Sequence, residues 1–149
     1  MIGITFKIKN EYNNFIAQIL KDVDVEKYEW DIYPGEIFQR HYNNKFFSEE
    51  HISGEYFSEC INRREYYLIF ADFKAFPIGK EHIEIQTFAQ YIKSKCDIVF
   101  LCVDSQFIEV FSKNESILQK VYENCKAMGA KNIEIVNSIE DPDRYMYAF

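Results

Sequence analysis

The feature that most constrains the fold is an unbroken apolar run at residues 98–103, with Asp97 and Asp104 at its two ends. The run is rich in β-branched and aromatic side chains and does not alternate with polar residues, which is typical of a strand buried on both faces. Residues 66–76 form a second run of this kind. We expect residues 98–103 to be the central strand of a sheet, and residues 66–76 to be the other candidate for that place.

A hairpin and a helix are predicted to follow the central strand. Residues 107–112 resume the apolar pattern after a two-residue interruption, which leaves room only for a tight antiparallel turn. Residues 112–115 match a capping box, and apolar side chains then recur at helical spacing as far as Met128. Gly129 can end this helix in a left-handed turn, and residues 132–136 predict a further strand. The helical connection between residues 107–112 and residues 132–136 is long enough for these two strands to be parallel neighbours in a right-handed crossover unit.

The start of the chain predicts a similar strand, helix and strand. Residues 2–8 alternate between apolar and other side chains, as in a strand with one buried face. Residues 15–23 have the helical period over about three turns, with Asn10 or Asn13 as the N-cap. Residues 28–32 alternate again, so we expect a second strand there.

Four shorter segments complete the expected fold. Residues 36–40 suit a short edge strand, Ser53 can cap a short helix, and residues 87–90 form a second capping box. Residues 145–149 alternate in the manner of an edge strand or a docking tail. Together these elements predict one α+β domain of two layers over the whole chain, with a mixed β-sheet of about five to seven strands and helices mainly on one face.

The charge of the chain limits its partners. Seventeen basic and 24 acidic residues give a net charge of −7, which disfavours nucleic acid and anionic membranes because phosphate groups are repelled. A basic protein or a solute remains compatible with this charge. The N-terminal residues carry charges where a signal peptide needs an apolar segment, so we expect a cytoplasmic protein.

The sequence shows no recognisable cofactor, metal or disulfide pattern. Its four cysteines are scattered without a C-x-x-C pair, and the expected state is four buried free thiols. No glycine-rich phosphate loop or paired-histidine helix is present. We therefore expect no bound cofactor and assign no catalytic or metal-binding residue.

Several polar residues still suggest chemistry. Asp72 and Lys74 share one side of a predicted strand, where a carboxyl could have a raised pKa, although an exposed ion pair at a strand end is the more ordinary alternative. Cys60 lies near basic residues that favour a thiolate, but it also lies on an apolar helical stripe. Asp104 is expected to satisfy backbone N–H groups in the hairpin turn. His51 follows two glutamates and could be a base or a ligand, although neighbouring loop residues rarely converge on one site.

The aromatic content suggests a binding surface. Aromatic residues make up 17% of the chain, and several fall beside acidic residues in segments with weak periodicity. Aromatic side chains anchor protein interfaces, and acidic groups at the rim steer a basic partner; the alternative is that these rings fill the core. The predicted partner-binding residues are Glu49, Glu50, Asp141, Asp143, Tyr145 and Tyr147.

Scattered aromatic and aliphatic positions also resemble a known family. They occur at residues 3–6, Tyr12, Leu20, residues 28–30, residues 66–77 and residues 103–105. In these positions the chain is similar to a family of small bacterial proteins known only as domain of unknown function 2691. The resemblance covers nearly the whole chain and implies a small intracellular protein, without an activity or functional residues to carry over.

Three functions are compatible with the sequence. The first is a non-enzymatic binding module for a basic protein, of the inhibitor or immunity type, which the acidic and aromatic residues favour. The second is a small-molecule-binding or enzymatic domain with a pocket between sheet and helices, drawing on Asp72, His51 or Cys60. The third is a structural homo-oligomer that pairs through an edge strand at residues 145–149.

Overall fold

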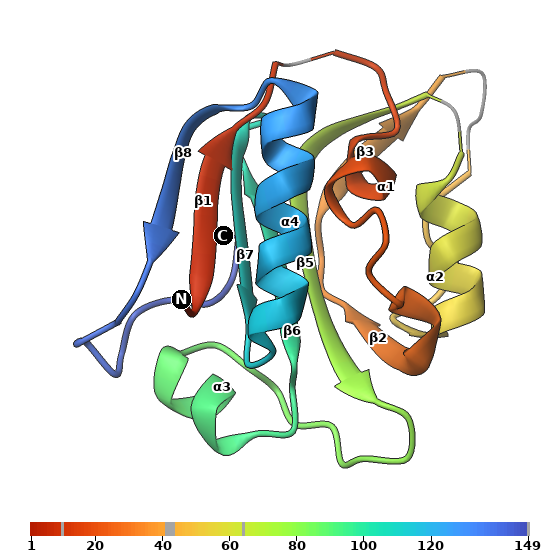
Figure 1. Ribbon diagram of the computed structural model, residues 1–149. Coiled ribbons are helices and arrows are strands. Elements are labelled where there is room, and N and C mark those ends of the chain that lie inside the picture. Colours follow the sequence, from red (N-terminus) through yellow and green to blue (C-terminus); the bar gives the residue numbers. More distant parts are fainter. Residues whose placement is uncertain (10, 41–43, 64, 149) are drawn as a thin grey trace.

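The computed structural model describes residues 1–9, 11–40, 44–63 and 65–148 (Figure 1). Within these residues the chain forms an open sheet of eight strands, four α-helices and one 3₁₀-helix. The strands are β1 (Gly3–Lys7), β2 (Tyr28–Ile32), β3 (Glu36–Gln39), β4 (His51–Ser53), β5 (Tyr66–Pro77), β6 (Ile98–Val103), β7 (Phe107–Ser112) and β8 (Lys131–Val136). The helices are α1 (Phe15–Ile19), η1 (Val25–Lys27), α2 (Gly54–Ile61), α3 (Phe88–Lys93) and α4 (Glu115–Met128).

The apolar run at residues 98–103 is the central strand, as predicted. The strand order is β4-β2-β5-β6-β7-β1-β8, with β3 also paired to β5, and every pair among the described strands is antiparallel. Phe100 of β6 lies opposite Phe73 of β5 on one side and Val110 of β7 on the other. Asp104 and Ser105 have φ angles of 51° and 68°, which form the tight hairpin turn that the sequence predicted.

The long strand β5 positions the polar residues discussed below. Its C-terminal half pairs with β2 and its N-terminal half pairs with β3, so β2 and β3 follow one another along the same edge of β5. In this register Asp31 of β2 lies opposite Lys74 of β5. On the other side of β2, Asp31 lies opposite His51 of β4.

Three helices cover one face of the sheet. Residues of α1, α2 and α4 join one buried cluster with the inward side chains of β1, β2, β5, β6 and β7, and Figure 1 shows these helices on the same side of the sheet. Trp30 of β2 is fully buried and stacks on Phe57 of α2 with ring centroids 3.8 Å apart. Its indole N–H donates to the carbonyl of Val25 at 3.0 Å, so the polar atom of this ring is satisfied.

The other face of the sheet has its own core. Phe76, Val99 and Leu101 lie here, on the alternate positions of β5 and β6, and Tyr91 of α3 packs with them. The C-terminal segment crosses the same face, where Met146 is fully buried. We call this side the tail face and the opposite side the helix face.

The predicted α+β class is confirmed, but four details of the predicted arrangement are not. Eight strands exceed the predicted five to seven, and the pairing is antiparallel rather than mixed. The two-layer arrangement is not confirmed, since α3 and the C-terminal segment contribute a second core. The expected crossover unit is also wrong in detail, because β1 lies between β7 and β8 and pairs with both. That the chain is one domain stays a prediction.

Local signals also misplaced two helix starts. The helix α4 begins at Glu115 with Asn114 as its N-cap, while the Ser112 hydroxyl accepts from the Asn114 N–H instead of closing a capping box. The helix α1 has only five residues, and its N-cap is Asn14 rather than Asn13; Asn10 lies outside the described residues. The chain leaves the helix after Ile19 because the next residues form a turn in which Asp22 has φ 66°.

The remaining helix ends follow the sequence. The Ser53 hydroxyl accepts from the Tyr56 N–H at the start of α2, and the capping box of Thr87 and Gln90 opens α3. Gly129 has φ 73° and ends α4 in the left-handed conformation. Within its described residues 145–148 the C-terminal segment is not an edge strand, because Tyr145 forms only a single bridge, with Thr87.

Candidate functional site

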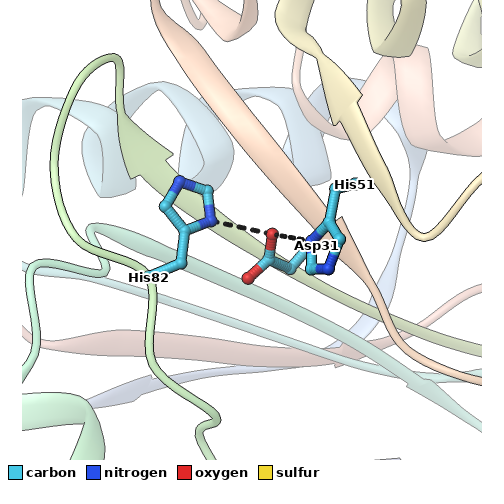
Figure 2. Close-up of side chains that lie close together, drawn as sticks. All are labelled: Asp31, His51 and His82. Atoms are coloured by element: carbon cyan, nitrogen blue, oxygen red, sulfur yellow. Dashed lines mark hydrogen bonds and ion pairs between the residues drawn. The ribbon is translucent and has the colours of Figure 1, made fainter.

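A polar cluster joins three segments that are distant in the sequence (Figure 2). Asp31 comes from β2, His51 from β4 and His82 from the connection between β5 and α3. Oδ1 of Asp31 lies 2.8 Å from Nδ1 of His51 and 2.8 Å from Nδ1 of His82. The Asp31 side chain is 8% exposed, His82 is 24% exposed and His51 is 76% exposed. The cluster therefore runs from the buried carboxyl to the surface.

Strand pairing and ring stacking hold the three side chains together. Trp30 points into the helix-face core, so its neighbour Asp31 points to the tail face and meets its cross-strand partner His51 there. The ring of His82 stacks on Phe76, with centroids 4.2 Å apart and planes inclined by 20°. The Ile85 N–H donates to the Tyr33 hydroxyl at 2.8 Å, which fixes the connection carrying His82 against β2.

The charge of Asp31 controls the chemistry of the cluster. Its carboxylate oxygen can accept from both imidazoles when each carries a proton on Nδ1. The hydrogen bond to Asp31, and then the negative charge of that carboxylate, raise the pKa of His51. A pocket of about 330 Å³ lies beside the cluster and is also lined by Glu50 and Glu84. The potential ligand atoms of the three residues lie within 4.8 Å of one another.

A buried ion pair lies next to this cluster on the tail face. Nζ of Lys74 donates to Oδ1 of Asp72 and lies 4.0 Å from the centroid of the Tyr33 ring. The Ala148 N–H donates to the other carboxyl oxygen, Oδ2, at 3.1 Å. Asp72 is 3% exposed and Lys74 is fully buried, so the predicted exposed pair at a strand end is wrong. Burial raises the pKa of Asp72 and lowers the pKa of Lys74.

The cysteine and the turn aspartate have structural surroundings. Cys60 is fully buried in the helix-face core, and burial raises the pKa of its thiol, so the neighbouring Arg63 does not make it a thiolate. Asp104 lies in the hairpin turn, and that its carboxyl group satisfies backbone N–H groups there stays a prediction. The set proposed for an enzymatic pocket is not assembled, because Cys60 and Asp72 belong to opposite faces and His51 binds Asp31 instead.

The predicted partner-binding residues lie in two separate groups. Glu49 and Glu50 precede β4, and the Glu50 carbonyl accepts from the Ile32 N–H of β2. The others lie in the C-terminal segment, which is tied to β7 through the ion pair of Arg144 and Glu109 at 2.7 Å. Strands β5 and β6 separate β2 from β7, so the structure does not bring the two groups into one patch.

The C-terminal group forms a defined surface. Asp141 and Asp143 are exposed, and the Asp141 carboxyl accepts from the Asp143 N–H at 2.9 Å. Tyr145 is 69% exposed and stacks on the half-buried Tyr147, with ring centroids 5.0 Å apart. We call these four residues the tail surface. Their role in binding stays a prediction.

The sequence reading missed Asp31 and His82. Asp31 had the ordinary polar position of an alternating strand, and His82 stood alone in a segment without periodicity. The hydrogen bonds join residues 20 and 51 positions apart, so no local spacing could show them. The one available signal was the scarcity of histidine, since the chain has three.

Comparison with known proteins places the chain in an uncharacterised group. A family model described as a protein of unknown function, DUF2691, matches residues 1–147. The chain is 29% identical over 146 residues to the uncharacterized protein YncE of Bacillus subtilis (strain 168), an alignment that covers 93% of this chain and 94% of that protein. No solved structure matches the chain. In the described part of the chain, none of the helices has the length and apolar character needed to cross a membrane.

Proposed function

We propose that this chain, which belongs to the DUF2691 family of unknown function, is a non-enzymatic binding module for a basic protein. The observation that carries this proposal is the tail surface, where the exposed Tyr145 stacks on the half-buried Tyr147 in the same segment as exposed acids. The occupant that fits is a segment with lysine or arginine residues and at least one apolar side chain.

Contacts with the rest of the fold anchor the tail surface, which favours binding. Met146 is fully buried and Ala148 is 6% exposed, so alternate residues anchor the segment and direct Tyr145 outward. The Ala148 N–H is fixed by Asp72, and Tyr145 is bridged to Thr87. An anchored aromatic pair loses little conformational entropy when a partner binds, so more of its contact energy contributes to affinity.

The charge around the tyrosines supports a basic occupant. Glu140, Asp141 and Asp143 are exposed, whereas the neighbouring Arg144 is already paired with Glu109. The surface therefore adds negative charge to a chain with a net charge of −7. Such a field accelerates encounter with a positive partner and weakens as salt is added.

Binding of short synthetic peptides tests the proposal. Fluorescence anisotropy would compare a lysine- and arginine-rich peptide with two aromatic residues against the same peptide with serine in place of them. We expect the aromatic peptide to bind the native chain more tightly than the serine peptide. Tyr145→Ser, or the double variant Asp141→Asn and Asp143→Asn, should weaken the binding of the aromatic peptide about tenfold or more.

Matched variants elsewhere provide the control. Glu26→Gln with Glu134→Gln removes the same charge from exposed sites, and Tyr12→Ser removes another exposed tyrosine that contacts a second tyrosine ring, Tyr67. These variants should change the affinity by less than about twofold. Equal weakening by the control variants would mean attraction to overall charge alone, and the proposed tail surface would be abandoned.

A second candidate is a small-molecule site, favoured by a different pocket. A cavity of about 490 Å³ is lined by aromatic rings such as Phe46 and Phe47 and by the charged residues Glu36, Glu49, Glu50 and Lys45. This volume is in the range of ligand pockets, and rings with surplus acids suit an organic cation. Thermal shift with a series of organic amines tests it, with Phe47→Leu expected to remove any stabilisation seen in the native chain. Amines that fail to raise its melting temperature would refute this candidate.

A further inference from the structure

We propose that Asp31, His51 and His82 form a binding site for a divalent transition-metal ion of the zinc type. Two imidazoles and one carboxylate are ligands that Zn²⁺, Co²⁺ and Ni²⁺ favour. Three protein ligands leave a coordination position for water at the neighbouring pocket, as in sites that exchange or activate a ligand. This site is independent of the tail surface, which lies over β7 and α3.

Two of the three distances between ligand atoms are close to those around a bound zinc ion. Tetrahedral bonds of about 2.0–2.2 Å place neighbouring ligand atoms about 3.3 Å apart. In the structure each histidine Nδ1 lies 2.8 Å from Oδ1 of Asp31, and the potential ligand atoms lie within 4.8 Å of one another. The two nitrogen–oxygen distances therefore need to lengthen by about half an ångström to admit the ion.

The surroundings hold the ligands in place before an ion arrives. Asp31 and His51 are cross-strand partners, so the sheet fixes their spacing. Phe76 orients the ring of His82 by stacking, and Figure 2 shows the two imidazoles on either side of the carboxylate. Side chains positioned by packing and sheet pairing lose less freedom on coordination, which supports metal affinity.

The local charge favours a dication. Glu50 and Glu84 line the same pocket as the three ligands, so three carboxylates surround the site. The nearest buried cation is Lys74, opposite Asp31 in register, and its charge is offset by Asp72. Calcium and magnesium prefer all-oxygen sites, so the two imidazoles select for transition metals over these abundant ions.

Metal titration of the full chain tests the proposal. After dialysis against a chelator, isothermal titration calorimetry with Zn²⁺ should show one site per chain. His51→Gln and His82→Gln should each weaken Zn²⁺ binding about 100-fold or more, since even indirect changes at metal sites cost 10–100-fold. Ca²⁺ and Mg²⁺ should give no comparable signal. His51 is 76% exposed and His82 is 24% exposed, so the His51 substitution in particular should leave the urea unfolding midpoint nearly unchanged.

A third histidine and a coloured ion supply the controls. His41→Gln removes the other histidine of the sequence and should leave Zn²⁺ affinity within about twofold of the native chain. Co²⁺ should give visible bands of nitrogen and oxygen coordination that disappear in His82→Gln. Three outcomes would overturn the proposal: unchanged affinity in His51→Gln and His82→Gln, loss of affinity in His41→Gln, or thiolate charge-transfer bands that assign the ion to cysteine.

Discussion

The buried pair of Asp72 and Lys74 gives the strongest stability prediction. Each side chain lies on β5 in the tail-face core, at 3% and 0% exposure. The Lys74→Met variant keeps most of the side-chain volume but leaves the Asp72 carboxylate without its positive partner. Removing one member of a buried ion pair costs about 3–5 kcal/mol of unfolding free energy, because the remaining charge is then uncompensated. We expect a loss of this size for Lys74→Met near neutral pH.

A double variant tests whether the loss of stability in Lys74→Met comes from the uncompensated charge of Asp72. Asp72→Asn combined with Lys74→Met removes both charges and retains an oxygen that can accept from the Ala148 N–H. A buried pair replaced by neutral side chains of similar volume is often no less stable than before. The double variant should therefore lie within about 1 kcal/mol of the native chain and recover at least about 2 kcal/mol relative to Lys74→Met.

The pH dependence of the single variants has opposite signs. Burial raises the pKa of Asp72 and the charge of Lys74 lowers it, so Lys74→Met leaves a carboxyl whose folded pKa exceeds its unfolded value of about 3.9. Such a group gives full stability below the unfolded pKa and loses it as pH rises through the folded one. In Asp72→Asn, burial keeps the folded pKa of Lys74 below its unfolded value, so stability is instead lost as pH falls through the folded pKa.

Urea unfolding between pH 4 and pH 9 measures all four members of this cycle. The reasoning requires the destabilisation of Lys74→Met to shrink at low pH and that of Asp72→Asn to shrink at high pH. Single losses below about 1 kcal/mol, or additive losses in the double variant, would show that water reaches the pair, and the assignment of a sealed ion pair would be refuted.

Three further predictions follow from single sites. Burial raises the pKa of the Cys96, Cys102 and Cys125 thiols to about 12, and the pKa of the Cys60 thiol above its usual value. A disulfide reagent at pH 8 should therefore label none of these four cysteines in the folded chain and all of them in urea. Gly129→Ala should cost about 1 kcal/mol in urea unfolding, since φ is 73° and no atom lies near the added methyl group. Thr87→Ala should cost about 1 kcal/mol and speed amide exchange in α3, because it removes the capping box.

Elements with local signals were predictable from the sequence. The strand β6 has six apolar residues in succession, and α4 combines a helical period with Gly129 at its end. Ser53 and Thr87 mark helix starts through hydrogen bonds within four residues. Ser112 shows the limit of such signals, because its hydroxyl is used by Asn114 and Asp97 in the fold. A motif of short range is reliable only when no other partner competes for the same atom.

The candidate metal site depended on contacts that local patterns do not encode. His51 lies in a three-residue strand and His82 in a connection without regular structure, so neither segment has a period to interpret. Their meeting requires β2 to pair with β4 on one side and β5 on the other, in one particular register. A shift of one residue would turn Asp31 to the helix face and separate it from both histidines.

The distribution of buried polar groups follows from what covers each face of the sheet. Of the buried polar and charged residues in the described chain, Asp31, Asp72 and Lys74 lie on the tail face, while Ser112 is the last residue of β7, just before α4. A helix satisfies its own backbone and offers an apolar stripe to the sheet, so strand residues beneath it need apolar side chains. The C-terminal segment and the β5–α3 connection are not part of a helix or sheet, so their backbone and side-chain groups can hydrogen-bond a charged side chain. The Ala148 N–H bonds Asp72 in this way, and His82 bonds Asp31. Chemistry in this fold is therefore expected on the face covered by irregular segments, where the proposed metal site lies.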